Sequence, residues 1–159
     1  MISVTVITVG SLKESYWRDA VAEYEKRLGG FCKINLVELK EHKLPENPSE
    51  ASIRTALSEE GARILAAIPP RSYRIALCVE GVQYSSEELA KKLENAFSQN
   101  GSIALIIGSS HGIAPEVKAA CEMRLSVSKL TFPHQMMRVL LLEVLYRSFS
   151  IIKGTKYHK

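Results

Sequence analysis

The chain has 159 residues, of which 46% are hydrophobic and 24% are charged. This length suits one domain and leaves little room for a second, and the composition excludes an intrinsically disordered chain. The formal net charge of +4 permits an anionic partner such as a nucleic acid without requiring one.

The cysteines and the first residues indicate a reducing compartment. Cys32, Cys78 and Cys121 lie far apart and form no C-x-x-C pair, which argues against a disulfide framework. The four histidines also lack metal-ligand spacing, so we expect no metal. The first residues lack the basic start of a signal peptide, and no apolar run is long enough to span a membrane. We therefore expect a cytoplasmic protein.

The first half of the chain predicts two strands and two helices in alternation. A β-branched, apolar run predicts a strand over 2–9. Apolar residues at helical spacing predict a helix that ends at the glycine pair 29–30. An alternating pattern predicts a strand over 32–39, and Ser49 is a natural N-cap for a helix over 50–67.

The second half repeats this alternation three times. Strands are expected at 73–80, with Gly81 as the exit, at 102–108 and at 124–128, and helices are expected at 85–100, at about 114–122 and from His134 onward. Strands that alternate with helices predict a mainly parallel α/β sheet with helices on both faces. Because ligands of such sheets bind at the carboxyl ends of strands, we expect the site in the loops that follow these three strands.

The run "LIIGSSHGI" places Gly108 and Gly112 on either side of a strand-to-helix turn. Two interpretations stay open: a turn that simply requires positive φ, or a backbone that approaches a ligand closely. The spacing matches neither a dinucleotide-binding fingerprint nor a Walker loop, which argues against a nucleotide hydrolase. We interpret His111, between the glycines, as a solvated surface residue.

The run "SKLTFPHQMMRVLLLEVLYRSF" joins a stiff loop to a helix that is apolar on almost all sides. The loop backbone suits the edge of an adenine; alternatively, Phe132 and Pro133 fill the core while Thr131 caps the helix. The helix is either buried or shared with a partner subunit, and we favour a homodimer. Arg138 is expected to pair with an acidic neighbour, and Arg147 with Glu143, four residues before it.

The chain ends in the basic segment "KGTKYHK". Such a segment is either a frayed end or an arm that stacks on bases and contacts phosphates.

Several of these segments together resemble the ribosomal RNA large subunit methyltransferase H family, which consists of small SPOUT-class enzymes. The resemblance covers essentially the whole chain, taken as one domain over 1–159. It rests on the runs "YWRDAVAEYEKRL", "SSEELA", "IIG", "LSVSKLTFPHQMMRV" and "LEVLYRSF" and on the terminal "YHK". It implies a homodimer that uses S-adenosyl-L-methionine to methylate N3 of a pseudouridine in 23S rRNA on the assembled ribosome.

The resemblance also implies a fold and a cofactor site. The C-terminal part of a SPOUT fold forms a deep trefoil knot, which holds the cofactor. Ser109 stands where family members commonly have a second glycine, so the turn or the cofactor affinity is expected to differ. Carried over by position, the cofactor-binding residues are Leu77, Gly108, Val127, Ser128, Lys129, Leu130, Thr131 and Phe132.

The catalytic residues that the resemblance implies are His134, Arg147, Tyr157 and His158. A protonated imide nitrogen has no available lone pair, so the reaction needs a base or a cation that stabilises the developing anion. Either His134 or His158 is expected to accept the N3 proton. Arg147 would steady the uracil oxygens or a phosphate, and Tyr157 would stack on the base or hydrogen-bond to it. The tail of one subunit would complete the site of the other.

Three rival functions stay open. A non-catalytic SPOUT protein that binds RNA or the ribosome is favoured only by Ser109. A SPOUT methyltransferase that acts on tRNA usually has an extra RNA-binding domain, for which this chain has no room. A small-molecule methyltransferase does not need the lysines of the tail. A net charge of +4 is weak for binding naked RNA, which favours a structured substrate such as the ribosome.

Overall fold

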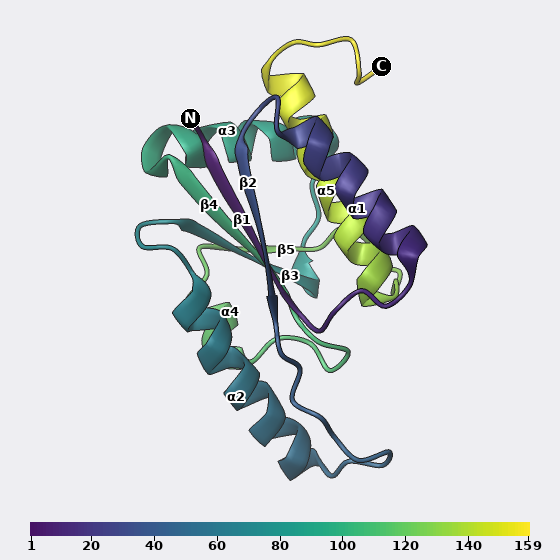
Figure 1. The fold of residues 1–159 in the computed structure, drawn as a ribbon. Coiled ribbons are helices and arrows are strands. Elements are labelled where there is room, and N and C mark those ends of the chain that lie inside the picture. Colours follow the sequence, from purple (N-terminus) through teal and green to yellow (C-terminus); the bar gives the residue numbers. More distant parts are fainter.

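The computed structural model describes residues 1–159 and contains one five-stranded sheet (Figure 1). The strand order is β2-β1-β4-β3-β5, and every neighbouring pair is parallel. The predicted α/β class is therefore confirmed. The strands are β1 (Ser3–Val9), β2 (Lys33–Leu39), β3 (Tyr73–Val82), β4 (Ser102–Ile107) and β5 (Met123–Leu125). The helices are α1 (Ser15–Leu28), α2 (Glu50–Ala67), α3 (Ser86–Asn100), α4 (Pro115–Ala119) and α5 (His134–Ile152).

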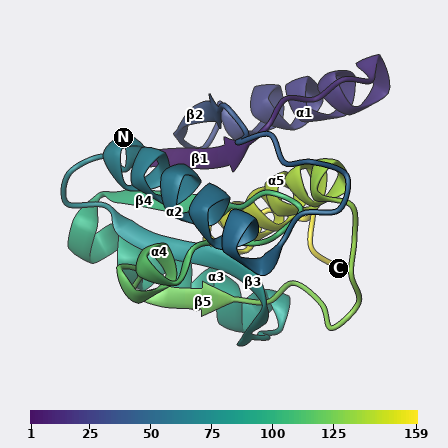
Figure 2. The same cartoon turned by 90° about the horizontal axis from the view of Figure 1, so that it is seen from below.

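Helices cover both faces of the sheet, and each face has its own core. Along β1, Val4 and Val6 belong to the core that α1, α3 and α5 cover, whereas Ile7 and Val9 belong to the core that α2 and α4 cover. This alternation follows from the two-residue period of a strand. Seen from below, in Figure 2, α2 and α4 lie in front of the strands. The central strand β4 is buried on both faces, which explains its uninterrupted apolar sequence.

The predicted helix ends are set by local hydrogen bonds. The Ser49 side chain accepts the amide of Ser52 at 3.1 Å and so caps α2. Ser85 and Glu88 form a reciprocal capping box at the start of α3, and Gly101, with φ of +68°, ends that helix. These three signals are confirmed. None of the five helices is both long and apolar enough to cross a membrane.

Three predicted boundaries in the second half are wrong. The strand β3 does not end at Gly81, because the chain continues as strand to Val82 after its register against β5 shifts. Glycine is needed there, since a Cβ would lie 2.6 Å from the carbonyl carbon of Leu125. The strand β5 ends at Leu125 and not at 128, although the Ser126 amide still donates to the carbonyl of Val82 at 3.0 Å. The helix α4 ends at Ala119.

Candidate functional site

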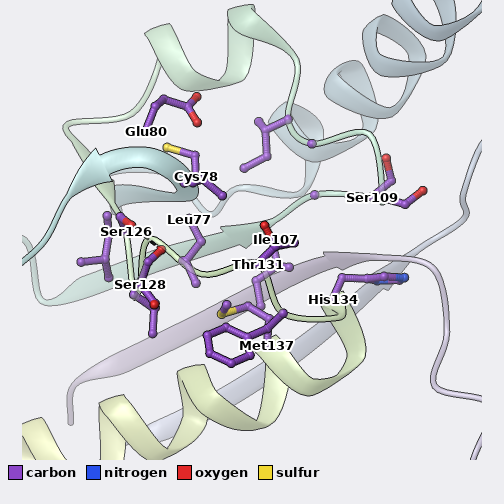
Figure 3. A pocket seen from close by; sticks show the side chains of 18 of the residues that line it. Leu77, Cys78, Glu80, Ile107, Ser109, Ser126, Ser128, Thr131, His134 and Met137 are labelled. Carbon is purple, nitrogen blue, oxygen red and sulfur yellow. Dashed lines mark hydrogen bonds between the residues drawn. The ribbon is translucent and has the colours of Figure 1, made fainter.

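The loops that follow β3, β4 and β5 surround one cavity of about 240 Å³ (Figure 3). The three strands are consecutive in the sheet, so their carboxyl ends meet at one edge. Half of the 20 lining residues are hydrophobic. Seven of the eight predicted cofactor residues line the cavity: Leu77, Gly108, Val127, Ser128, Leu130, Thr131 and Phe132. The eighth, Lys129, is exposed and does not line it.

The turn after β4 needs glycine at two positions for different reasons. A Cβ on Gly108 would lie 2.2 Å from the carbonyl oxygen of Gly112, so only glycine allows the turn to close. Gly112 adopts a φ of +94°. Between them, Ser109 is buried, keeps a negative φ and accepts the amide of Gly112 at 2.9 Å. A serine at 109 therefore fits the turn without strain in its own backbone.

Side-chain hydroxyls fix the loop after β5. The buried Ser126 hydroxyl donates to the carbonyl of Ser128 at 3.0 Å, and the Ser128 hydroxyl accepts the amide of Leu130 at 3.0 Å. Such local bonds draw the backbone away from the sheet ladder and hold the loop without a ligand. Thr131 is exposed and does not cap α5, whose N-cap is Pro133 without a side-chain bond. That alternative for Thr131 is therefore wrong.

His134 opens α5 and lies at the border of the cavity. It lines both the cavity and a polar groove beside it, and in Figure 3 its ring extends away from Thr131. Burial lowers the pKa of His134, the positive charge of Arg138 lowers it further, and Glu41 opposes both. The imidazole is therefore neutral at pH 7 and able to accept a proton.

Arg138, one turn further along α5, is 5% exposed and ties the helix to the sheet. Its Nη2 donates to the carbonyl oxygens of Val9 at 3.2 Å and Gly10 at 2.8 Å. Its Nη1 donates to Glu38 Oε2 at 2.7 Å, so the predicted acidic partner comes from β2. These bonds fix the start of α5, and hence His134, against the carboxyl ends of β1 and β2.

The other predicted catalytic residues gather at the far end of α5. Arg147 donates to Glu143 Oε1 from Nε at 2.9 Å and from Nη2 at 2.6 Å. The Tyr157 hydroxyl donates to Glu143 Oε2 at 2.8 Å, and the Arg147 guanidinium lies 4.7 Å from the centre of the Tyr157 ring. His158 Nε2 lies 2.8 Å from Glu87 Oε1 on α3. The tail is therefore folded onto α3 and α5 and is not frayed.

Glu143 is the centre of this cluster, and its charge shapes the neighbouring pKa values. Burial raises the pKa of Glu143, but contacts with Tyr24, Tyr157 and Arg147 outweigh burial and lower it. The hydrogen bond to Glu143 raises the pKa of Tyr157, and burial adds to this. The carboxylate thus stays ionised and keeps the Tyr157 phenol protonated at neutral pH.

One chain does not bring the four predicted catalytic residues together. His134 and Arg147 are 13 positions apart along α5, which at 1.5 Å per residue is about 20 Å. Arg147, Tyr157 and His158 form one cluster, and His134 lies apart from them, at the cavity. Sequence reasoning missed Glu38 and Glu87, which lie far from their partners in the chain and gave no signal.

Comparisons with known proteins agree with this architecture. A family model described as "Predicted SPOUT methyltransferase" matches residues 2–158. Two curated proteins named "Ribosomal RNA large subunit methyltransferase H" come from Streptococcus thermophilus strains CNRZ 1066 and ATCC BAA-250 / LMG 18311. Each is 49% identical to this chain over 159 residues, which cover 99% of this chain and 100% of the relative. The chain belongs to the SPOUT methyltransferase family.

Proposed function

We propose that this protein uses S-adenosyl-L-methionine to methylate N3 of a pseudouridine in 23S rRNA of the large ribosomal subunit. The names of the two relatives support rRNA of the large subunit as the substrate. The observation that carries the proposal is a cavity built by three strand-end loops, with the neutral imidazole of His134 at its border.

The lining of the cavity fits S-adenosyl-L-methionine, which is part apolar and part polar. Leu77, Ile107 and Phe132 offer apolar surface to an adenine ring and methylene groups. The loop after β5 offers hydroxyl and backbone groups to the polar parts. When bound, this cofactor supplies an electrophilic methyl group, so the protein mainly has to align and activate the nucleophile. Lys129 is a weaker candidate for direct contact, because it lies outside the lining.

His134 at the cavity and the residues of the tail cluster would together activate the imide nitrogen. His134 is neutral and reaches the border of the cavity, so it is the better candidate to accept the N3 proton. His158, which lies beside Glu87, is the alternative. The Arg147 guanidinium would stabilise the developing negative charge on the uracil oxygens or hold a phosphate. Tyr157, protonated at neutral pH, would donate to the base or stack on it.

A homodimer would bring the two groups of residues together. About 20 Å of α5 separates His134 from Arg147 in one chain, so a second copy would have to supply the tail cluster. Met136, Val139 and Leu140 on α5 are only partly buried in the single chain. A second copy packed on this apolar surface would bury it further and complete the site.

The proposed substrate is the assembled ribosome in the cytoplasm. A formal charge of +4 gives a single chain limited attraction to free RNA at physiological salt. A structured surface that is recognised by its shape adds contacts that do not depend on charge alone.

The test is transfer of a labelled methyl group to ribosomes that lack the modification. We expect label at one pseudouridine of the large-subunit rRNA, and much less label with Arg147→Ala or Tyr157→Phe. Label on tRNA instead would redirect the substrate, and absence of cofactor binding in calorimetry would favour a non-catalytic RNA-binding protein.

A further inference from the structure

A second hollow shares His134 with the cavity. It has a volume of about 570 Å³ and follows the carboxyl ends of β1 and β2. Ten residues line it, and only Leu39 among them is hydrophobic. We name it the lysine groove, after Lys13, Lys40 and Lys43. Its polar lining suits a charged, hydrated ligand and not an apolar helix or a small apolar molecule.

The lysines of this groove have no acidic partner in the chain. Lys13, Lys40 and Lys43 are exposed, and none of them is within 4.0 Å of a carboxylate oxygen. Two carboxylates also line the groove, but Glu38 is held by Arg138 at 2.7 Å, which leaves only Glu41. The groove therefore has an excess of positive charge that the chain itself does not neutralise, which indicates an anionic partner.

The floor of the groove is rigid and is fixed relative to His134. Gly10, with φ of +92°, donates its amide to the carbonyl of Leu39 at 2.8 Å. Its own carbonyl accepts Arg138 Nη2 at 2.8 Å. A Cβ on Gly10 would lie 4.0 Å from His134 Cε1, so the groove and the imidazole are in near contact. A ligand in the groove would therefore reach the same ring that borders the cavity.

We propose that the lysine groove binds the sugar–phosphate backbone of the RNA strand beside the target nucleotide. This proposal rests on the proposed function and adds a docking surface to it. Lysine ammonium groups contact phosphates without reading sequence, and such contacts fix the register of a strand on a protein. His134 lines both hollows, so a strand held in the groove places a neighbouring nucleotide at the border of the cavity that would hold the methyl donor.

Charge argues against the partner's tail as the occupant. The tail carries Lys153, Lys156 and Lys159, which the lysines of the groove would repel.

The experiment compares two triple variants of the full chain with equal loss of charge. The test variant is Lys13→Ala/Lys40→Ala/Lys43→Ala, and the control variant is Lys26→Ala/Lys33→Ala/Lys91→Ala. All three control lysines are exposed, have no ion pair and lie outside the groove. Methyl transfer to unmodified ribosomes is measured against ribosome concentration at several KCl concentrations. Binding of S-adenosyl-L-methionine is measured separately by calorimetry.

We expect the test variant to raise the KM for ribosomes about tenfold, with an unchanged kcat and an unchanged Kd for the cofactor. The slope of log KM against log salt should fall by about 2, because each lost phosphate contact removes roughly 0.7 from it. The KM of the control variant should stay within about twofold of the wild-type value. A third variant, Lys13→Arg/Lys40→Arg/Lys43→Arg, keeps the charge and should have the wild-type KM. A test variant with wild-type KM and salt slope would overturn the proposal and leave the proposed function intact.

A binding measurement separates the two proposals. Cosedimentation with unmodified ribosomes, without cofactor, requires no methyl transfer. One outcome would be that the wild-type protein cosediments, the test variant does not, and the wild-type protein gives no label in the methyl-transfer assay. That outcome would refute the proposed function and support the groove. Equal cosedimentation of the wild-type protein, the test variant and the control variant would overturn the proposal that the groove binds RNA.

Discussion

The two ends of α5 carry similar residue types in very different surroundings. At the first turns, Arg138 is 5% exposed and donates to two backbone carbonyls and to Glu38. At the last turns, the side chain of Arg147 is 33% exposed and donates to Glu143 on its own helix. The first arginine joins three elements of the fold, whereas the second joins a helix to the tail that follows it.

This difference in burial predicts different roles for the two arginines. A buried guanidinium leaves several polar groups unsatisfied when it is removed, so the fold depends on it. A partly exposed ion pair within one helix contributes less to stability and is within reach of an incoming ligand. The first end should therefore control the shape of the cavity, and the second end should control chemistry on the RNA.

The largest effect is expected for Arg138→Ala. The substitution leaves the carbonyls of Val9 and Gly10 and the carboxylate of Glu38 without their donor. We expect a loss of about 3 kcal/mol in the free energy of unfolding, measured by urea titration. Arg147→Ala is the matched control and should lose less than about 1 kcal/mol. Equal losses of unfolding free energy in the two variants would show that the fold does not depend more on Arg138 than on Arg147.

The next effect is on catalysis and should appear at the other end. Arg147→Ala removes the proposed cation beside the base, so we expect methyl transfer to fall about 100-fold. The Kd for S-adenosyl-L-methionine should not change, because Arg147 does not line the cavity of its own chain and, from a second copy, is proposed to contact the base. Single-turnover labelling and calorimetry measure these two quantities. A weaker cofactor affinity with normal methyl transfer would contradict the proposed role of Arg147 as a cation beside the base.

A third, smaller effect concerns pH and the first end. The pKa of His134 is lowered by burial and by Arg138, against the opposing charge of Glu41. A base acts in its neutral form, so the single-turnover rate should fall by about tenfold per pH unit only below this lowered pKa. The measurement is the rate between pH 5 and pH 8. In His134→Gln the remaining rate should lack this acidic decline, whereas an unchanged decline would assign the base to another residue.

The smallest effect should be on how firmly the C-terminal tail is docked. Tyr157→Phe removes one hydrogen bond to Glu143, and loss of about 1 kcal/mol would increase the undocked population about fivefold. Limited trypsin digestion reports this population, because Lys153 and Lys156 are exposed cleavage sites. The substitution Tyr16→Phe, at an exposed tyrosine of α1, is the control and should not change the cleavage rate.

Local signals made much of the fold predictable. Ser49, the pair Ser85 and Glu88, and Gly101 act through bonds within a few residues, so their sequence context is sufficient. The place of Gly81 inside β3 was not predictable, because the need for glycine there comes from the approach of Leu125, a residue far along the chain. The same reason explains why the partner of Arg138 was expected only as an unspecified acid.

The candidate site was predictable in part. Strand order alone indicated the three loops, and seven of the eight residues taken from the family resemblance line their shared cavity. The separation of His134 from Arg147 is simple helix geometry, but its meaning depends on a second copy that one sequence does not describe. The trefoil knot stays a prediction, as do the roles of the four catalytic candidates.

The bonds of Arg138 have a consequence for synthesis of the chain. They join residues 100, 128 and 129 positions apart in the sequence, so they form only after most of the chain has left the ribosome. At a rate of about 5–20 residues per second, β1 and β2 wait several seconds for α5. During this time one face of the nascent sheet lacks α5 as part of its cover, and the uncovered apolar surface is open to chaperones and to aggregation. Contacts between such distant residues also make folding slow, so refolding yield should depend strongly on protein concentration.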